Sequence, residues 1–130
     1  MTPSLFRPPS VSAFGRKIGP GEPVFIVAEL SANHAGSLSR AKDLIHLAKE
    51  AGADGIKLQL YSASDMTVED SGQAFTVPGD GPWAGRTLWD LYSEGRTPEE
   101  WIGPLFDEGK KAGIPVFATP FSPGAALYLS

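Results

Sequence analysis

The chain has 130 residues, of which 42% are hydrophobic and 20% are charged, a composition that fits one modest globular domain. The formal net charge is −4 and no basic run occurs, so we expect no nucleic-acid partner and no membrane partner. The chain has no cysteine, which excludes disulfide bonds and thiolate chemistry and fits a cytoplasmic protein. No apolar stretch reaches the roughly 20 residues of a membrane span, and we expect no secretory signal in residues 1–12.

The first residues are predicted to differ from the rest of the chain. Residues 1–16 are expected to form an N-terminal arm that is poorly ordered or loosely attached, and residues 17–130 to form the folded domain. Residues 14–19, followed by Pro20 and Gly21, are typical of a short strand and a turn. Such a piece either covers the bottom of a barrel or remains a surface arm, and both interpretations stay open.

An apolar run with a polar end begins at Val24. Residues 24–28 are apolar at successive positions, which is typical of a parallel strand with both faces buried. The run ends at Glu29, and Asn33 and His34 follow in a turn. A strand interior does not accommodate an unpaired carboxylate. We therefore expect Glu29 at the C-terminal end of the strand, where barrels and open α/β sheets place their chemistry.

A strand–helix–strand unit follows from this run. Ser37 is a good helix N-cap, apolar residues then recur at three- and four-residue steps, and Gly52 provides a stop. Residues 55–60 are predicted to form the second strand, parallel to the first and joined to it by a right-handed crossover. The apolar positions of the intervening helix are Leu38, Ala41, Leu44, Ile45 and Ala48.

A long connection separates the second strand from the third, which is predicted at residues 114–119. The extra length lies in residues 61–96, a stretch rich in Gly, Pro, Asp and Ser, and long loops after a strand are usually functional. Within this stretch, residues 87–94 are predicted to form a short helix. The pattern Thr97-Pro98-Glu99-Glu100 then predicts a capping box that begins a further helix, which ends at Gly113.

Residues 123–130 begin a third helix of this kind and stop within it. Three parallel strands do not close a TIM barrel, which takes about 250 residues. We therefore predict an α/β fold made of the first three βα units of a (β/α)8 barrel, truncated in the third helix. A complete three-stranded α/β domain is the alternative. In both cases the open sheet edges favour pairing with another chain.

Three polar side chains are predicted to converge at one end of the sheet. Glu29 ends the first strand, Lys57 lies inside the second and Thr119 ends the third. Lys57 interrupts Ile56 and Leu58, so it should point to the opposite face, towards the axis of a closed barrel. A buried lysine needs an anion, either Glu29 or a bound phosphate or carboxylate. A structural ion pair without a catalytic role is the alternative.

Weaker candidates flank these three residues. Gln59 shares the face of Lys57 and is suited to hydrogen-bond a polar ligand. From the residues alone, Asn33 is more simply a turn former, and His34 a solvated or hydrogen-bonded histidine. Residues 119–123 place two hydroxyls and an aromatic ring before a helix start, which suits phosphate or is ordinary turn chemistry. With two histidines and no cysteine, no metal-ligand spacing stands out.

Three motifs, taken in order, resemble the sialic acid synthase family. They are residues 26–37 (IVAELSANHAGS), 52–59 (GADGIKLQ) and 118–121 (ATPF). The phrases GRTLWDLY at 85–92 and TPEEW at 97–101 are most similar to the pseudaminic acid synthase branch of that family. The resemblance runs from about Lys17 to the last residue. It implies a (β/α)8 barrel followed by a small antifreeze-like domain, with residues 17–130 as the N-terminal part of the barrel.

Members of this family condense phosphoenolpyruvate with an aldose to give a nonulosonic acid, and a divalent metal polarises the sugar aldehyde. The resemblance implies an N-acylated amino sugar as the second substrate, a homodimer, and Mn or Mg held by ligands outside this chain. This fragment alone is then expected to be inactive. An N-acetylneuraminate or legionaminate synthase is a close alternative. An alternative from another class is a non-catalytic, self-associating barrel remnant.

The resemblance also implies roles for individual residues. Glu29 and Lys57 would be catalytic, with Glu29 near the developing cation and the attacking water. Lys57 and Thr119 would bind phosphoenolpyruvate. Arg86 would contact the sugar, and its loop, together with Trp83, would shape the choice of sugar. The other sugar contacts would come from Asn33, His34, Gln59 and Phe121.

Overall fold

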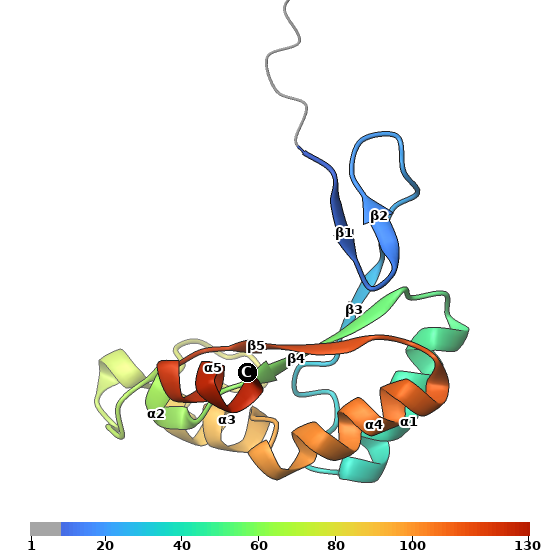
Figure 1. Ribbon diagram of the computed structural model, residues 1–130. Coiled ribbons are helices and arrows are strands. Elements are labelled where there is room, and N and C mark those ends of the chain that lie inside the picture. The colour runs from blue at the N-terminus through green and yellow to red at the C-terminus, as the bar shows by residue number, and fades with distance from the viewer. Residues whose placement is uncertain (1–8) are drawn as a thin grey trace, which may run out of the picture.

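A computed structural model describes residues 9–130 of the chain (Figure 1). Residues 1–8, half of the predicted arm, lie outside the described residues. No helix within residues 9–130 is both long enough and apolar enough to cross a bilayer. The elements in chain order are β1 (Val11–Ala13), β2 (Arg16–Ile18), β3 (Val27–Glu29), α1 (Leu38–Glu50), β4 (Gly55–Leu60), α2 (Ala63–Met66), the 3-10 turn η1 (Gln73–Phe75), α3 (Leu88–Gly95), the 3-10 turn η2 (Glu99–Trp101), α4 (Ile102–Ala112), β5 (Val116–Pro120) and α5 (Pro123–Leu129).

The body of the protein is a three-stranded parallel sheet in the order β3-β4-β5. Helices α1 and α4 lie together on one side of the sheet, and the β1–β2 hairpin stands on the other side (Figure 1). We call the hairpin side of the sheet the inner face. The arrangement confirms the predicted α/β fold, the first three βα units of a barrel ending in the third helix.

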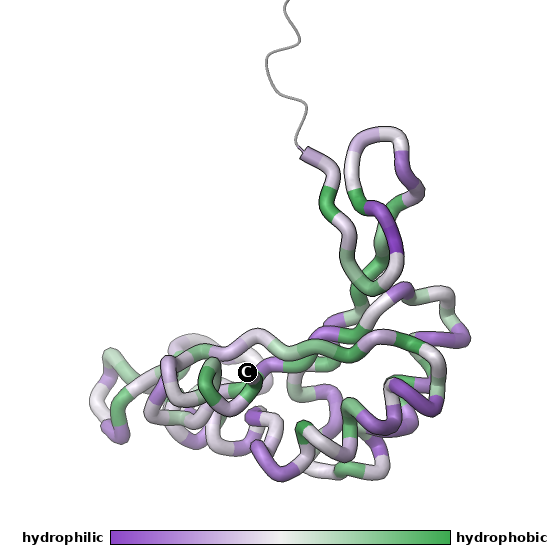
Figure 2. The backbone as a smooth tube through the Cα atoms, viewed as in Figure 1, coloured by the Kyte–Doolittle hydropathy of each residue, from purple (hydrophilic) through white to green (hydrophobic). Residues whose placement is uncertain are grey.

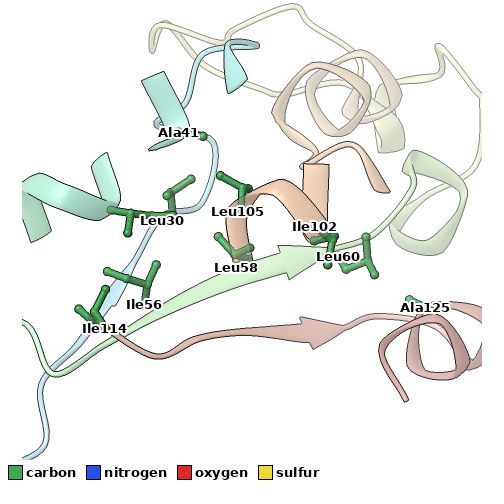
Figure 3. Close-up of a cluster of buried hydrophobic side chains, with 10 residues drawn as sticks. Leu30, Ala41, Ile56, Leu58, Leu60, Ile102, Leu105, Ile114 and Ala125 are labelled. Atoms are coloured by element: carbon green, nitrogen blue, oxygen red, sulfur yellow. The ribbon is translucent and has the colours of Figure 1, made fainter. Parts of the chain in front are cut away.

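The core lies between the sheet and its helices. Even-numbered residues of β4 point into it, and Figure 3 shows Ile56, Leu58 and Leu60 facing the helical side chains. Hydrophobic residues follow the strands, whereas hydrophilic residues follow much of the helices (Figure 2). This pattern is the one expected of helices that cover one face of a sheet. The buried apolar side chains are Leu30, Ala41, Ile45, Ile56, Leu58, Leu60, Ile102, Leu105, Ile114 and Ala125.

Strand β3 differs from the prediction for the apolar run. It pairs over three residues only, and Val24, Ile26 and Val27 are exposed rather than buried on both faces. The physical reason is that β3 lies at the edge of this sheet, and the described residues leave much of its surface uncovered. Continuous apolar residues therefore indicated the strand correctly but not its burial in this chain.

Local capping chemistry sets most of the helix ends as predicted. The Ser37 side chain accepts from the Arg40 N–H at the start of α1, and Gly113 ends α4 in the left-handed region at φ 67°. The capping box predicted at Thr97 is wrong. Thr97 is only 2% exposed, and the 3-10 turn η2 begins after Pro98 without a side-chain cap. The capping box forms instead at Ser62, where α2 begins.

The β1–β2 hairpin occupies part of the predicted arm. Strand β1 lies within residues 1–16, and it pairs antiparallel with β2. The ring of Phe14, at the tip, stacks on Phe25 and on Phe117. The Arg16 guanidinium pairs with the Asp54 carboxylate just before β4. Of the two interpretations left open, the structure therefore supports a hairpin that covers the N-terminal end of the strands on the inner face.

Candidate functional site

The inner face of the sheet carries the polar side chains that the sequence singled out. Side chains alternate along a strand, so odd-numbered residues of β3, β4 and β5 share this face. The register sets Glu29 beside Lys57, and Lys57 beside Phe117. It also sets Gln59 beside Thr119. The site is thus ordered in levels, each of them two residues further along the strands.

Glu29 and Lys57 form an ion pair at the first of these levels. The Lys57 Nζ lies 2.6 Å from the Glu29 Oε2, and the two side chains are 37% and 33% exposed. The Leu30 N–H donates to the Lys57 carbonyl, which holds the end of β3 against β4. Backbone pairing therefore holds the two residues side by side, while about a third of each side chain remains exposed to a ligand on the inner face. An ammonium in this position can bind an anionic group, and the carboxylate can accept a proton or orient water.

Thr119 lies on the same face but not at the same level. It is opposite Gln59, two residues further along the strand than the level of Lys57, a step of roughly 6–7 Å. Strand β5 extends to Pro120, one residue beyond the predicted end. The structure therefore brings Glu29 and Lys57 into contact and places Thr119 with Gln59 above them. The four side chains line one face, as expected for groups that serve one ligand.

An aromatic row continues the inner face beyond the strand ends. The Phe121 N–H donates to the Leu60 carbonyl, so the ladder extends past β4. Tyr61 then meets Phe121 edge to face at 5.5 Å between ring centroids, and Tyr92 at 6.0 Å. Burial raises the pKa of the Tyr61 hydroxyl. Sequence reasoning included Phe121 but missed Tyr61, although the two-residue spacing of Lys57, Gln59 and Tyr61 already indicated a shared face.

Arg86 lies in a cleft next to this aromatic row. The cleft has a volume of about 260 Å³, and the Arg86 guanidinium pairs with the Glu94 carboxylate at 2.5 Å. Neither Glu29 nor Lys57 lines it. The structure therefore places Arg86 beyond the upper end of the inner face, separate from the ion pair. The side chains lining the cleft include Tyr61, Trp83, Arg86, Tyr92 and Glu94.

The structure does not place Asn33 and His34 with the others. The Asn33 amide donates to the Leu30 carbonyl, and its side chain lines a groove of about 300 Å³ between β3 and α1, which Glu29 also borders. His34 is 0% exposed and meets Trp101 edge to face at 5.4 Å. The structure therefore gives no support to the predicted sugar contact of His34, whose side chain is enclosed in the core.

His34 is instead a neutral core histidine. Its Nδ1 accepts from the Gly36 N–H, so this nitrogen carries no proton. Its Nε2 has no hydrogen-bond partner among the described residues. Burial lowers the pKa of the imidazole, and the Gly95 backbone opposes that effect. The histidine thus stabilises the turn between β3 and α1 rather than contributing to the inner face.

A metal site is not formed by the described residues alone. Residues 9–130 contain no group of three or more His, Cys, Asp or Glu side chains suited to holding an ion. The one carboxylate of the inner face that the sequence singled out, Glu29, is already paired with Lys57. The residues present therefore do not fit a divalent metal without further ligands.

Comparisons with known proteins agree with the motifs that lie along this face. The model of the NeuB family matches residues 44–130. The chain belongs to the NeuB family. It is 46% identical over 99 residues to a pseudaminic acid synthase of Campylobacter jejuni subsp. jejuni serotype O:2, covering 76% of this chain and 29% of that protein. It is 43% identical over 101 residues to a pseudaminic acid synthase of Helicobacter pylori, covering 78% of this chain and 29% of that protein.

A solved structure extends the likeness of this NeuB-family chain to the fold. An N-acetylneuraminic acid synthetase of Leptospira borgpetersenii superposes with a TM-score of 0.75 at 27% sequence identity. The match covers 93% of this chain and 37% of that one. The chain spans about 29% of the length of the pseudaminic acid synthases that it matches. Its fold thus matches one part of these longer relatives.

Proposed function

We propose that this chain is the N-terminal part of a synthase that condenses phosphoenolpyruvate with an N-acylated amino sugar. The product is a nonulosonic acid of the pseudaminic acid type, together with inorganic phosphate. The observation that carries this proposal is the Glu29–Lys57 ion pair on the inner face of a NeuB-family sheet. The likeness to two pseudaminic acid synthases supports the choice of product class.

The polar levels of the inner face suggest how the substrates are held. The Lys57 ammonium binds an anionic group of phosphoenolpyruvate, and the Thr119 hydroxyl one level above donates to its phosphate. Gln59 lies beside Thr119 and is placed to hydrogen-bond the sugar. Phe121, in the aromatic row, and Arg86, in the cleft next to that row, contact the distal part of the sugar. Such a column orients two substrates along one line, which is how positioning accelerates a bimolecular step.

The proposed reaction forms two bonds at phosphoenolpyruvate and breaks one. C3 attacks the sugar aldehyde, so a carbon–carbon bond forms, the aldehyde oxygen becomes a hydroxyl with a proton from water, and cationic character develops at C2. The Glu29 carboxylate stabilises that charge and orients the water that adds to C2. The bond between C2 and the phosphate oxygen then breaks, C2 becomes a carbonyl carbon, and phosphate leaves with the proton that the added hydroxyl gives up. A divalent ion in the longer protein would polarise the sugar aldehyde and would need ligands from outside residues 9–130.

The Lys57→Ala variant of the full-length protein tests the proposal. We expect it to abolish phosphate release that depends on both phosphoenolpyruvate and sugar, because the anion then lacks its ammonium partner. Lys110→Ala is the matched control, since Lys110 is an exposed lysine on α4 whose ion-pair partner within residues 9–130 is Asp107. Wild-type turnover in Lys57→Ala would contradict the proposal. If 2-acetamido-2-deoxymannose were the only sugar that gave product with phosphoenolpyruvate, the enzyme would be an N-acetylneuraminate synthase instead.

A further inference from the structure

The two-residue column of inner-face positions on β4 continues downward from Lys57 to Gly55. A Cβ atom at Gly55 would be tight, 3.1 Å from the Phe25 ring, and would touch the Phe117 ring at 3.5 Å. Phe117 is also the strand partner of Lys57. Aromatic rings therefore fill the space directly below Lys57 and lie beside it.

The third ring comes from the hairpin. Phe14 stacks on Phe25 with 6.0 Å between ring centroids and on Phe117 with 5.4 Å, at interplanar angles of 26° and 23°. The Arg16 guanidinium lies 5.2 Å from the centre of the Phe25 ring and pairs with Asp54, which fastens the hairpin at this position. We call Phe14, Phe25 and Phe117 the aromatic floor.

The backbone at Phe14 indicates that its ring is needed. Phe14 has φ 52° in the hairpin turn, a conformation that favours glycine or asparagine and is unusual for a bulky side chain. The neighbouring Gly15, at φ 74°, fits the same turn without strain. Phe14 is also 53% exposed, so burial does not explain the choice of residue. The strained backbone at Phe14 instead places its ring on the Phe25 and Phe117 rings, below Lys57.

We propose that the aromatic floor is a positioning element for Lys57. The rings close the N-terminal side of the inner face, so the lysine stem is supported from below and its ammonium is directed towards Glu29 and the upper levels. They also keep water from the lower side of the ion pair, which strengthens its attraction for an anion. Phe14 touches no substrate and acts through Phe117 and Phe25. This inference rests on the proposed function of Lys57.

Three substitutions at one position test the floor in the full-length protein. Phe14→Ala and Phe14→Gly both remove the ring, but glycine relieves the strained backbone and alanine does not. Phe14→Tyr keeps the ring. We expect both ring-less variants to raise the KM for phosphoenolpyruvate by the same factor, roughly two- to tenfold, because only part of the energy of the two lost aromatic pairs acts on Lys57. Phe14→Tyr should keep the wild-type KM, as should Val11→Ala, an exposed hairpin control.

A merely structural role makes a different prediction. The KM would then follow the midpoint of thermal unfolding, and Phe14→Gly would be closer to the wild type than Phe14→Ala. That result, or a wild-type KM in both ring-less variants, would overturn the inference.

A second measurement does not depend on turnover. Acetylation of Lys57 by acetic anhydride, measured by mass spectrometry against Lys110, should be faster in both ring-less variants, by a similar factor. If the full-length wild-type protein made no product from phosphoenolpyruvate and sugar, the proposed function would be refuted. The acetylation rates would then still decide the inference: faster acetylation of Lys57 would support the floor, and unchanged rates would overturn it.

Discussion

Gly109 is the position where a single methyl group should do most harm to this fold. It lies on α4 facing β5, and a Cβ atom there would be 2.3 Å from the Val116 Cγ2 and 2.9 Å from the Ile114 carbonyl oxygen. The first contact is with a stiff β-branched side chain and the second with backbone, so neither gives way easily. Gly109→Ala therefore forces α4 away from the sheet. Overpacking of this kind costs about 2–3 kcal/mol at the upper end of its range.

Helix propensity acts in the opposite direction. Alanine is favoured over glycine in a helix by about 1 kcal/mol, so we expect Gly109→Ala to lower the free energy of unfolding by a net amount of about 1–2 kcal/mol. Gly103 is the matched control on the same helix, because a Cβ atom there would meet nothing within 4 Å beyond the adjoining backbone of its own helix. Gly103→Ala should change the free energy of unfolding by less than about 1 kcal/mol, because the ring of the following Pro104 offsets the gain in helix propensity.

Urea unfolding followed by circular dichroism measures both changes. A third variant, Gly109→Ala with Val116→Ala, removes the closest clash, so the cost of Gly109→Ala should be smaller in the Val116→Ala background than in the wild type. If Gly109→Ala were no more destabilising than Gly103→Ala, the close approach of α4 to β5 would not constrain this position, and the reasoning would be refuted.

Two further predictions concern pH. Burial lowers the pKa of His34 below its usual 6.5, so the unfolded chain binds more protons than the folded chain just below that pH. The free energy of unfolding should therefore fall as the pH drops from 6.5 towards the folded pKa. In His34→Gln, urea unfolding at a series of pH values should show no such fall from this residue. The pKa of Glu108 is lowered by the hydrogen bond with His46 and by Lys111 and Lys42, so its stabilising effect is present above its unfolded pKa and is lost as the pH falls through the folded value. Glu108→Gln should therefore be less stable than the wild type at neutral pH and equally stable in acid, and a difference that persisted in acid would argue against an ionic origin.

Much of the fold followed from local chemistry in the sequence. Strand β4 has the predicted bounds, because the alternation of Lys57 and Gln59 with apolar neighbours is independent of distant contacts. Ser37 and Gly113 set helix ends by backbone hydrogen bonding and by a left-handed residue, and both effects are local. The parallel order of three strands followed from their connections. Local patterns therefore predicted the scaffold that presents the site.

The parts that were missed depend on distant contacts. Thr97 resembles an N-cap, but packing buries it, so Pro98 and a 3-10 turn begin the next helix. His34 follows Glu29 by five residues, yet it is enclosed beside Trp101, from a segment far along the chain. The level of Thr119 depends on the register of β5 against β4, which no single strand sequence specifies. Burial and register are thus the two properties that the sequence alone left undetermined.

The contacts of Asp54 help to set the strand register that places Glu29 opposite Lys57. The Ile26 N–H donates to the Asp54 carboxylate at 2.8 Å, and the Asp54 N–H donates back to the Ile26 carbonyl at 2.8 Å. A slip of β3 by one residue would turn Glu29 towards the helices and leave Lys57 facing a vacant edge. Because β3 pairs over only three residues, these two hydrogen bonds fix its register against β4. The Asp54 carboxylate therefore keeps Glu29 opposite Lys57.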